Sequence, residues 1–381
     1  MIYFDHAATG LPKSEGVINA VENGMRFFGN PGRGIYNLAA AGDRAIFECR
    51  KALAEKFNTL PQNCILTKNT TEALNIAIKG FINGRKEKTN VLFSNYDHNA
   101  VVRIFYSDTI KRKINIYTFE SHLFDDNKTL ESFKKALGHK PDLVVLTHAS
   151  NVCGRIFPLE RMVAEAKNTG ATVITDIAQT AGSIDISAGA HGDILCMPGH
   201  KGFYGPAGTG AMIVSKDFSV PLTPLSDGGT GILSAYKEMP DILPERFEAG
   251  SINAPCFAGL EKAVKEEKHK DKKLAKKIYT YLLSELRNIK GVTVIGAPEK
   301  GMEHLWMPII LINLWGFHCE EVAEYLAEKN IAVRSGLHCS PNAHKSLGTI
   351  KTGGVRISIG RGNTFADADK LLDAVARKVT C

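Results

Sequence analysis

The sequence contains no long apolar run. No stretch reaches the roughly 18 consecutive apolar residues that a membrane-spanning helix requires. The first residues, MIYFDHAATG, place Asp5 and His6 ahead of any apolar segment of the kind found in signal peptides. These absences predict a protein that has no membrane association and is located in the cytoplasm.

Paired cysteines are also missing. The eight cysteines are scattered, with no CxxC pair and no Cys/His spacing typical of a zinc site. The sequence therefore predicts neither a disulfide framework nor a bound metal, and most of these thiols are expected to be buried. Cys339 differs because its neighbours in the segment LHCSPN are polar or turn-forming, which favours a reactive thiol over a structural one.

The net charge of +7 is not distributed as in a nucleic-acid-binding protein. Residues 265–277 hold seven lysines against three acidic residues, without interleaved aromatic side chains, inside a helical pattern. A solvated helix face explains such a run better than a nucleic-acid groove does. We therefore expect no nucleic-acid partner.

Short apolar runs alternate with amphipathic segments over the first two thirds of the sequence. This pattern predicts βαβ units in a mainly parallel sheet covered by helices on both faces, which binds its ligand beyond the carboxyl ends of the strands. The predicted strands are 64–67, 91–94, 114–119, 143–149, 172–176, 193–197 and 211–214, with helices at 72–81 and 159–168 among them.

The pattern changes after Gly250. One long charged helix is predicted over about 257–289, followed by strands near 292–296, 308–313, 331–335 and 354–360 and by helices near 319–329 and from Thr364. A length of 381 residues exceeds the roughly 250–300 residues of a usual single core. We predict a large domain over 1–255 and a smaller α+β domain over 256–381; the extreme N-terminus is left open to pack with either.

Two residues indicate a cofactor that contains a pyridine ring. Asp176 ends a strand, where a buried carboxylate needs a cationic partner, and a protonated pyridine nitrogen would provide one. Capping of the next turn explains Asp176 alone equally well. Lys201 follows His200 between a strand and a glycine-rich turn, a setting that suits a lysine forming a Schiff base, although most lysines are surface charges.

The segment CILTKNTTEALN predicts a strand, a polar turn and a helix that begins near Thr70 and Thr71. The free N–H groups and positive dipole end of a helix N-terminus suit a phosphate. Simple N-capping by a threonine explains the same pattern. The later run GPAGTG precedes a strand and does not open a helix, so it is not a dinucleotide-binding loop.

Taken together, these segments resemble the class V aminotransferase family of fold-type-I pyridoxal phosphate (PLP) enzymes, in the branch of cysteine desulfurases and selenocysteine lyases. The resemblance spans nearly the whole chain and implies an α/β fold with a seven-stranded, mainly parallel sheet. Its motifs, in order, are FDHAATG, NTTEALN, NYDHNAV, THASNVCGRIFPLE, TDIAQTAG, GHKGFYGPAGTG, FEAGSIN, RSGLHC and VRISIGRGNT.

The resemblance implies a role for each site residue. Lys201 would carry PLP as a Schiff base, Asp176 would hold the pyridine nitrogen, Gln179 the phenolate oxygen, and His98 would stack on the ring. Arg356 would bind the substrate carboxylate through a bidentate fork, and Cys339 would accept the sulfur. The remaining implied contacts are those of Thr70, Thr71 and His200 with the phosphate, of Ser251 from the second subunit of a homodimer with the same group, and of Asn151 with cofactor and substrate.

The implied activity is conversion of L-cysteine to L-alanine with a persulfide on Cys339, which a sulfur-acceptor or scaffold protein would receive. A selenocysteine lyase, another β-lyase or an aminotransferase of the same family is the alternative, and a non-catalytic regulator with this fold is a more distant one. The sequence leaves the pathway open among iron–sulfur clusters, thiolated tRNA, a cofactor and selenium metabolism.

Two positions depart from the family pattern. Pro198 stands where relatives usually carry a hydroxyl residue before Gly-His-Lys, and proline offers the phosphate no donor. Leu337 stands where close relatives often carry a second histidine, and a short connection joins Cys339 to Arg356. The short connection resembles desulfurases with a compact cysteine loop, which tend to pass sulfur to a dedicated acceptor.

Overall fold

The computed structural model describes residues 1–32, 34–266 and 269–380, so Cys381 and residues 267–268 of the lysine-rich run lie outside the described residues. Its larger sheet has seven strands in the order β2-β8-β7-β6-β5-β3-β4. Four of its six strand pairings are parallel, and β8 runs antiparallel to β2 and β7. The expected α/β fold with a mainly parallel seven-stranded sheet is confirmed. The strands are β2 (Cys64–Thr67), β3 (Thr89–Ser94), β4 (Ile114–Phe119), β5 (Leu143–Thr147), β6 (Thr172–Asp176), β7 (Ile194–Pro198) and β8 (Gly210–Val214).

Helices cover both faces of this sheet because its strands are apolar on both sides. In β5, Leu143 and Val145 face one core, and Val144 and Leu146 face another, as the two-residue period of a strand requires. One face packs on α3 (Thr70–Asn83) and α4 (Asn99–Phe105). The other packs on α2 (Asn37–Phe57), α5 (Asp126–Leu137), α6 (Leu159–Asn168) and α7 (Ala254–Lys265), with α1 (Glu15–Phe27) beside α7.

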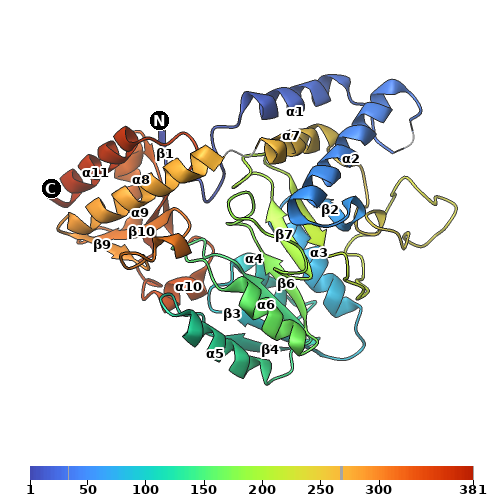
Figure 1. The fold of residues 1–381 in the computed structure, drawn as a ribbon, viewed down its shortest axis with the longest axis horizontal. Coiled ribbons are helices and arrows are strands. Elements are labelled where there is room, and N and C mark those ends of the chain that lie inside the picture. The colour runs from blue at the N-terminus through green and yellow to red at the C-terminus, as the bar shows by residue number, and fades with distance from the viewer. Residues whose placement is uncertain (33, 267–268, 381) are drawn as a thin grey trace.

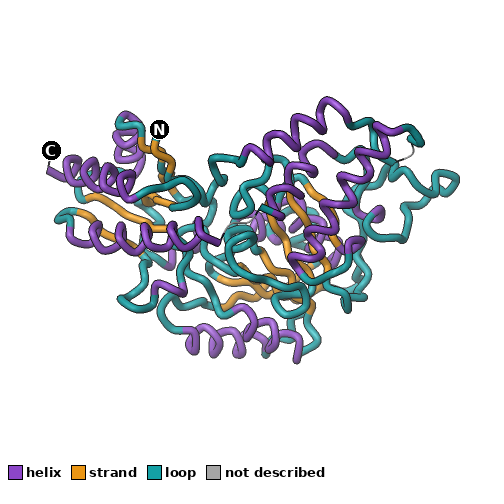
Figure 2. The backbone as a smooth tube through the Cα atoms, turned by 45° about the horizontal axis from the view of Figure 1, so that its top comes forward, coloured by secondary structure: helices purple, strands orange, loops and turns teal. Residues whose placement is uncertain are grey.

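A second, four-stranded antiparallel sheet is built from the C-terminal part of the chain in the order β12-β13-β10-β9. Figure 1 shows it beside the larger sheet, with both chain termini on its side, and Figure 2 shows the strands as two separate groups. The strands are β9 (Val292–Ile295), β10 (Ile309–Leu314), β12 (Arg334–Gly336) and β13 (Gly354–Ser358), and the helices are α8 (His269–Asn288), α9 (Cys319–Glu328), α10 (Pro341–Ser346) and α11 (Phe365–Thr380).

The extreme N-terminus also joins this region, because β1 (Ile2–Tyr3) pairs in parallel with β11 (Ile331–Ala332). One face of the smaller sheet packs on α8, α9 and α11. From the opposite face, Leu311 packs against Tyr96, Val152 and Phe157 of the larger part. The loops between the two sheets therefore bring together residues that are distant in sequence.

The single long helix predicted over about 257–289 is wrong, because the structure has two helices there, α7 and α8. The apolar face of α7, with Phe257 and Leu260, packs on the core beside the larger sheet. The apolar face of α8, with Ile278 and Leu282, packs on the smaller sheet. The two halves of the helical pattern over 257–289 therefore pack on two different cores. The predicted division at residue 255 falls inside α7.

Candidate active site

A pocket opens where the expected strands of the larger sheet end. Thr147, Asp176 and Pro198 are the last residues of β5, β6 and β7, and all three line it. Parallel strands place their carboxyl ends at one edge of a sheet, so side chains that follow them converge there. The remaining lining residues are Asn69, Thr70, Thr71, His98, Ala100, Ala149, Asn151, Ala178, Gln179, His200 and Lys201.

Asp176 and Lys201 form the charged centre of this pocket. The side chain of Asp176 is buried, and it accepts a hydrogen bond from the N–H of Ala178 at 2.8 Å. Burial raises the pKa of Asp176, an effect that Lys201 opposes. Burial lowers the pKa of Lys201 to about 8, against the opposing charge of Asp176. The lysine is therefore a far better nucleophile near neutral pH than a solvated lysine.

His98 lies between β3 and α4, where its Nδ1 caps the helix by accepting the N–H of Ala100 at 3.0 Å. Burial first, and then the charge of Lys201, lower the pKa of His98 to about 4. The ring is therefore neutral over the physiological range. A neutral ring that lines the pocket is suited to stacking on a planar ligand.

One end of the pocket has the features of an anion site. Helix α3 begins here, capped by Asn69, whose side chain accepts the N–H of Glu72. The hydroxyl of Thr70 and the Nδ1 atom of His200 are buried and have no hydrogen-bond partner among the described residues. Buried polar atoms are rarely left without a partner. Thr70 lies at the N-terminus of α3 and His200 lines the same pocket, so both atoms are available to an anion that binds there.

Arg356 lies on β13 and is buried. Its Nη1 donates to the carbonyl of Asn151 at 2.9 Å, and its Nη2 pairs with the carboxylate of Asp5 at 2.7 Å. Its Nε has no hydrogen-bond partner among the described residues. A substrate carboxylate that binds Arg356 therefore finds the Nε–H unused, whereas Nη1 already donates to Asn151 and Nη2 to Asp5.

Gln179 and Asn151 reach the pocket from the loops after β6 and β5. The amide of Gln179 donates to the carbonyl of Ala7 at 3.2 Å. The side chain of Asn151 instead bonds both residues that flank Cys339, donating to the His338 carbonyl and accepting the Ser340 hydroxyl, each at 2.7 Å. The exposed Cys339 is thus held beside the pocket.

Ser251 does not line this pocket in the single chain. It lies in a groove beside Phe47, Arg50, Glu248 and Gly231, along the middle of α2. The contact of Ser251 with the phosphate, which the resemblance assigns to a second copy of the chain, stays a prediction.

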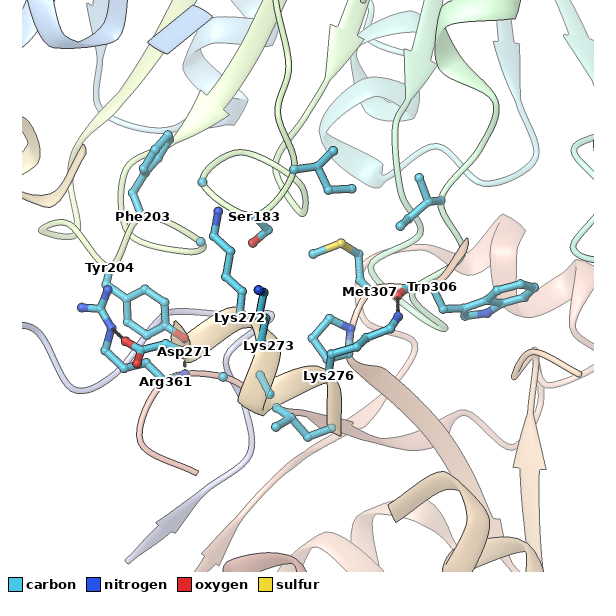
Figure 3. A pocket seen from close by; sticks show the side chains of 18 of the residues that line it. Ser183, Phe203, Tyr204, Asp271, Lys272, Lys273, Lys276, Trp306, Met307 and Arg361 are labelled. Atoms are coloured by element: carbon cyan, nitrogen blue, oxygen red, sulfur yellow. Dashed lines mark hydrogen bonds and ion pairs between the residues drawn. The ribbon is translucent and has the colours of Figure 1, made fainter. Parts of the chain in front are cut away.

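A larger cavity of about 600 Å³ lies between the two parts of the chain, and no residue of the predicted site lines it. Figure 3 shows Lys272, Lys273 and Lys276 of α8 on one side of it and Phe203 and Ser183 on the other. The ammonium of Lys276 donates to two main-chain carbonyls, and Arg361 pairs with Asp271 at 3.0 Å. Several of the charged side chains that line this cavity are therefore already bonded within the protein.

The pocket residues fit PLP. A buried carboxylate, a lysine with a lowered pKa, a neutral histidine and unpaired polar atoms at a helix N-terminus match its ring nitrogen, aldehyde, ring face and phosphate. The group would be held by Asp176, Lys201, His98, Thr70 and His200.

Three contributors were missed by sequence reasoning. Asp5 pairs with Arg356 although 351 positions separate them. Ser340 and His344 anchor the cysteine loop through buried hydrogen bonds. The motif FDHAATG placed Asp5 in a matched segment, which was a usable signal, but periodicity contains no information on contacts between such distant segments.

Comparison with known proteins agrees with this geometry. The family model described as Aminotransferase class-V matches residues 2–371. A probable cysteine desulfurase of Methanothermobacter thermautotrophicus is 30% identical, over 97% of this chain and 92% of its own. A probable cysteine desulfurase of Pyrococcus abyssi is also 30% identical, over 100% of this chain and 94% of its own.

A solved structure gives the same result for the fold. The apo structure of a cysteine desulfurase from Thermococcus onnurineus NA1 superposes with a TM-score of 0.88 at 25% identity, covering 100% of this chain and 94% of the other. A fold match over the full length places the pocket, its strand ends and the second sheet within one known architecture.

Proposed function

This chain belongs to the class V aminotransferase family, and from that premise we propose that it is a PLP-dependent cysteine desulfurase. The observation that carries the proposal is the exposed thiol of Cys339, held beside a pocket that contains the buried Asp176 and the half-buried Lys201. A transaminase has no need of a thiol at this position. The relatives named above support the same activity.

When bound, PLP supplies an electron sink that makes the bonds to the substrate Cα easier to break. Asp176 would keep the ring nitrogen protonated, and Gln179 would hold the phenolate oxygen. The phosphate would contact Thr70, Thr71 and His200 of this chain and Ser251 of a second copy. Pro198 offers no donor, so the backbone at the start of α3 is expected to contribute more.

The protein's residues then orient the substrate. Arg356 binds the α-carboxylate of L-cysteine, and the neutral amine of Lys201 accepts the Cα proton and later returns it. Asn151 lies between Arg356 and the cysteine loop, because its carbonyl contacts Arg356 and its side chain contacts the loop. This arrangement directs the substrate side chain toward Cys339.

Sulfur transfer is a displacement at the substrate sulfur atom. The Cys339 thiolate forms an S–S bond as the Cβ–S bond of the substrate breaks, and the electron pair of the broken bond remains on the carbon side. Protonation there yields L-alanine, and Cys339 is left as a persulfide. A sulfur-acceptor or scaffold protein would then remove the outer sulfur.

The proposal extends to the assembly. Ser251 lines a groove other than the pocket of its own chain, which supports a homodimer with shared sites. We further propose a large domain over 1–255, a small domain over 256–381 that carries Cys339 and Arg356, and a cytoplasmic location. Among the described residues, no helix combines the length and apolarity that a bilayer crossing demands.

The main alternative is a selenocysteine lyase or another β-lyase or aminotransferase of the family, because such enzymes would share almost every site residue. A non-catalytic regulator is a further alternative, against which the presence of Lys201 and Asp176 in one pocket argues. Dependence on Cys339 separates a desulfurase from an aminotransferase, and activity on L-cysteine separates it from a lyase that acts only on selenocysteine.

The test compares the wild type with Cys339→Ala and, as a control, Cys256→Ala, which changes a half-buried thiol on α7. The measurement is release of L-alanine and sulfide from L-cysteine with dithiothreitol. We expect the wild type and Cys256→Ala to form both products, and Cys339→Ala to keep its cofactor absorbance without turnover. Equal activity of all three proteins, or a wild type inert on cysteine, would refute the desulfurase proposal and favour a selenocysteine lyase or transaminase.

A further inference from the structure

The loop that carries Cys339 has an unusual backbone. His338 and Cys339 both have positive φ angles, 51° and 57°. Residues other than glycine, asparagine and aspartate seldom adopt this left-handed region, and each instance has a conformational cost that the surroundings must offset. Something must therefore hold the loop in place.

Hydrogen bonds from the larger part of the chain hold it on both sides of the nucleophile. The amide of Asn151 donates to the His338 carbonyl and accepts the Ser340 hydroxyl, each at 2.7 Å. The Cys339 carbonyl itself accepts the N–H of Asn99 at 2.8 Å. Asn99 directly follows His98 at the start of α4, so the loop is attached to two segments that line the cofactor pocket.

A second set of contacts anchors the loop within the smaller part. His338 Nε2 bonds the Arg334 carbonyl at 3.2 Å, which requires a proton on Nε2 and leaves Nδ1 to accept from His344 Nε2 at 3.2 Å. His344 Nδ1 then accepts the Thr349 hydroxyl at 2.7 Å. Burial lowers the pKa of His338 to about 3 and that of His344 to about 4, so both histidines of this hydrogen-bond network stay neutral.

We propose that Ser340 is a positioning residue for Cys339, and that the hydrogen bond from its hydroxyl to Asn151 holds the loop of the nucleophile over the substrate. This hydrogen bond is called the latch below. Ser340 is fully buried, and its hydroxyl is the hydrogen donor that reaches the Asn151 oxygen. Asn151 also contacts Arg356 through its carbonyl. One residue therefore links the group that binds the substrate carboxylate to the loop that presents the thiol. This proposal rests on the proposed function and assigns a role to Ser340, a residue that the proposed function does not use.

The latch predicts a specific defect for Ser340→Ala. Without the hydroxyl, one side of Cys339 loses its attachment and the strained turn relaxes. Because displacement by about 1 Å can cost roughly 100-fold in rate, we expect kcat for L-cysteine to fall about 10- to 100-fold. KM and the cofactor absorbance should stay unchanged, since Arg356 and the pocket are intact. Ser340→Thr retains the hydroxyl and should recover most of kcat.

A second readout does not depend on turnover. In the absence of substrate, iodoacetamide labels an exposed thiol, and mass spectrometry of the peptide containing Cys339 gives its alkylation rate. A released loop should change this rate severalfold in Ser340→Ala. Ser346→Ala is the matched control, because Ser346 lies on the same helix α10 but is exposed and bonds elsewhere.

Asn151→Asp tests the same latch from the other side, should Ser340→Ala fail to fold. It replaces the donor to His338 by an oxygen and should alter Cys339 alkylation in the same direction. The proposal is overturned if Ser340→Ala and Asn151→Asp are alkylated at Cys339 at the wild-type rate and Ser340→Ala has the same kcat as Ser346→Ala. It is also overturned if kcat falls only together with cofactor absorbance. A wild type inert on cysteine refutes the desulfurase function, whereas the alkylation rates still decide whether the latch exists.

Discussion

At the scale of single residues, burial lowers the pKa of the basic groups in the site. Lys201, His98 and His200 all have pKa values lowered mainly by burial, to about 8, about 4 and about 4. Neutral histidines accept hydrogen bonds and stack on a neutral or cationic ring, whereas a neutral lysine can attack a carbonyl. Burial thus prepares these side chains before any ligand binds.

The lowered pKa of Lys201 predicts how cofactor capture depends on pH. An amine attacks an aldehyde only when unprotonated, and this fraction rises as pH passes upward through the pKa. We expect the rate at which cofactor-free protein captures PLP to rise between about pH 7 and 9 and then level off. Stopped-flow absorbance measures this rate, and Lys201→Arg, which cannot form the bond, sets the background. A rise only above about pH 10 would show that the lysine is solvated.

Sequence reasoning placed the residues of the pocket but not the bonds between them. Asp176, Lys201 and His98 follow predicted strands, and the topology of a parallel sheet brings strand ends together. The pairing of Arg356 with Asp5 and the bonds of Asn151 to the cysteine loop join segments more than 180 positions apart. Such contacts follow from how two sheets pack, on which the local pattern of a sequence contains no information.

At the scale of elements, the start of α3 combines three favourable features for a phosphate. Asn69 caps the helix from a fully extended backbone, Thr70 and Thr71 are its first residues, and the positive end of the helix dipole faces the pocket they line. The cap leaves the Thr70 hydroxyl without a hydrogen-bond partner among the residues that the structure describes. The capping explanation and the phosphate explanation, which were alternatives for the sequence, are therefore compatible in the structure.

This division of roles predicts the effect of Thr70→Ala. Because Asn69 still caps the helix, the stability of the cofactor-free protein should change by less than about 0.5 kcal/mol. Loss of one hydrogen bond to a charged phosphate should raise the Kd for PLP about tenfold or more. Titration followed by cofactor absorbance measures Kd, and Thr280→Ala on α8, whose hydroxyl is exposed, is the control. An unchanged Kd would remove Thr70 from the phosphate site.

At the scale of the whole molecule, several large apolar side chains on and beside α1 and α2 face solvent. Met25, Tyr36 and Phe47 are each more than half exposed there, and Tyr236 of the loop near Ser251 is 69% exposed. Clusters of this kind on soluble proteins commonly mark protein–protein interfaces. The same face contains the groove in which Ser251 lies, so the proposed homodimer accounts for both features.

If this face joins two copies, Phe47→Arg should convert the protein from dimer to monomer. Phe47 is 55% exposed and lines the groove with Ser251, so an arginine from each copy would place unpaired charges in the interface. The monomer should also bind PLP more weakly, because the Ser251 contact comes from the other copy. Sedimentation velocity and cofactor titration measure the two effects. Trp315→Arg, at an exposed aromatic residue of the smaller part, should change neither, and a Phe47→Arg protein that stays dimeric would place the interface elsewhere.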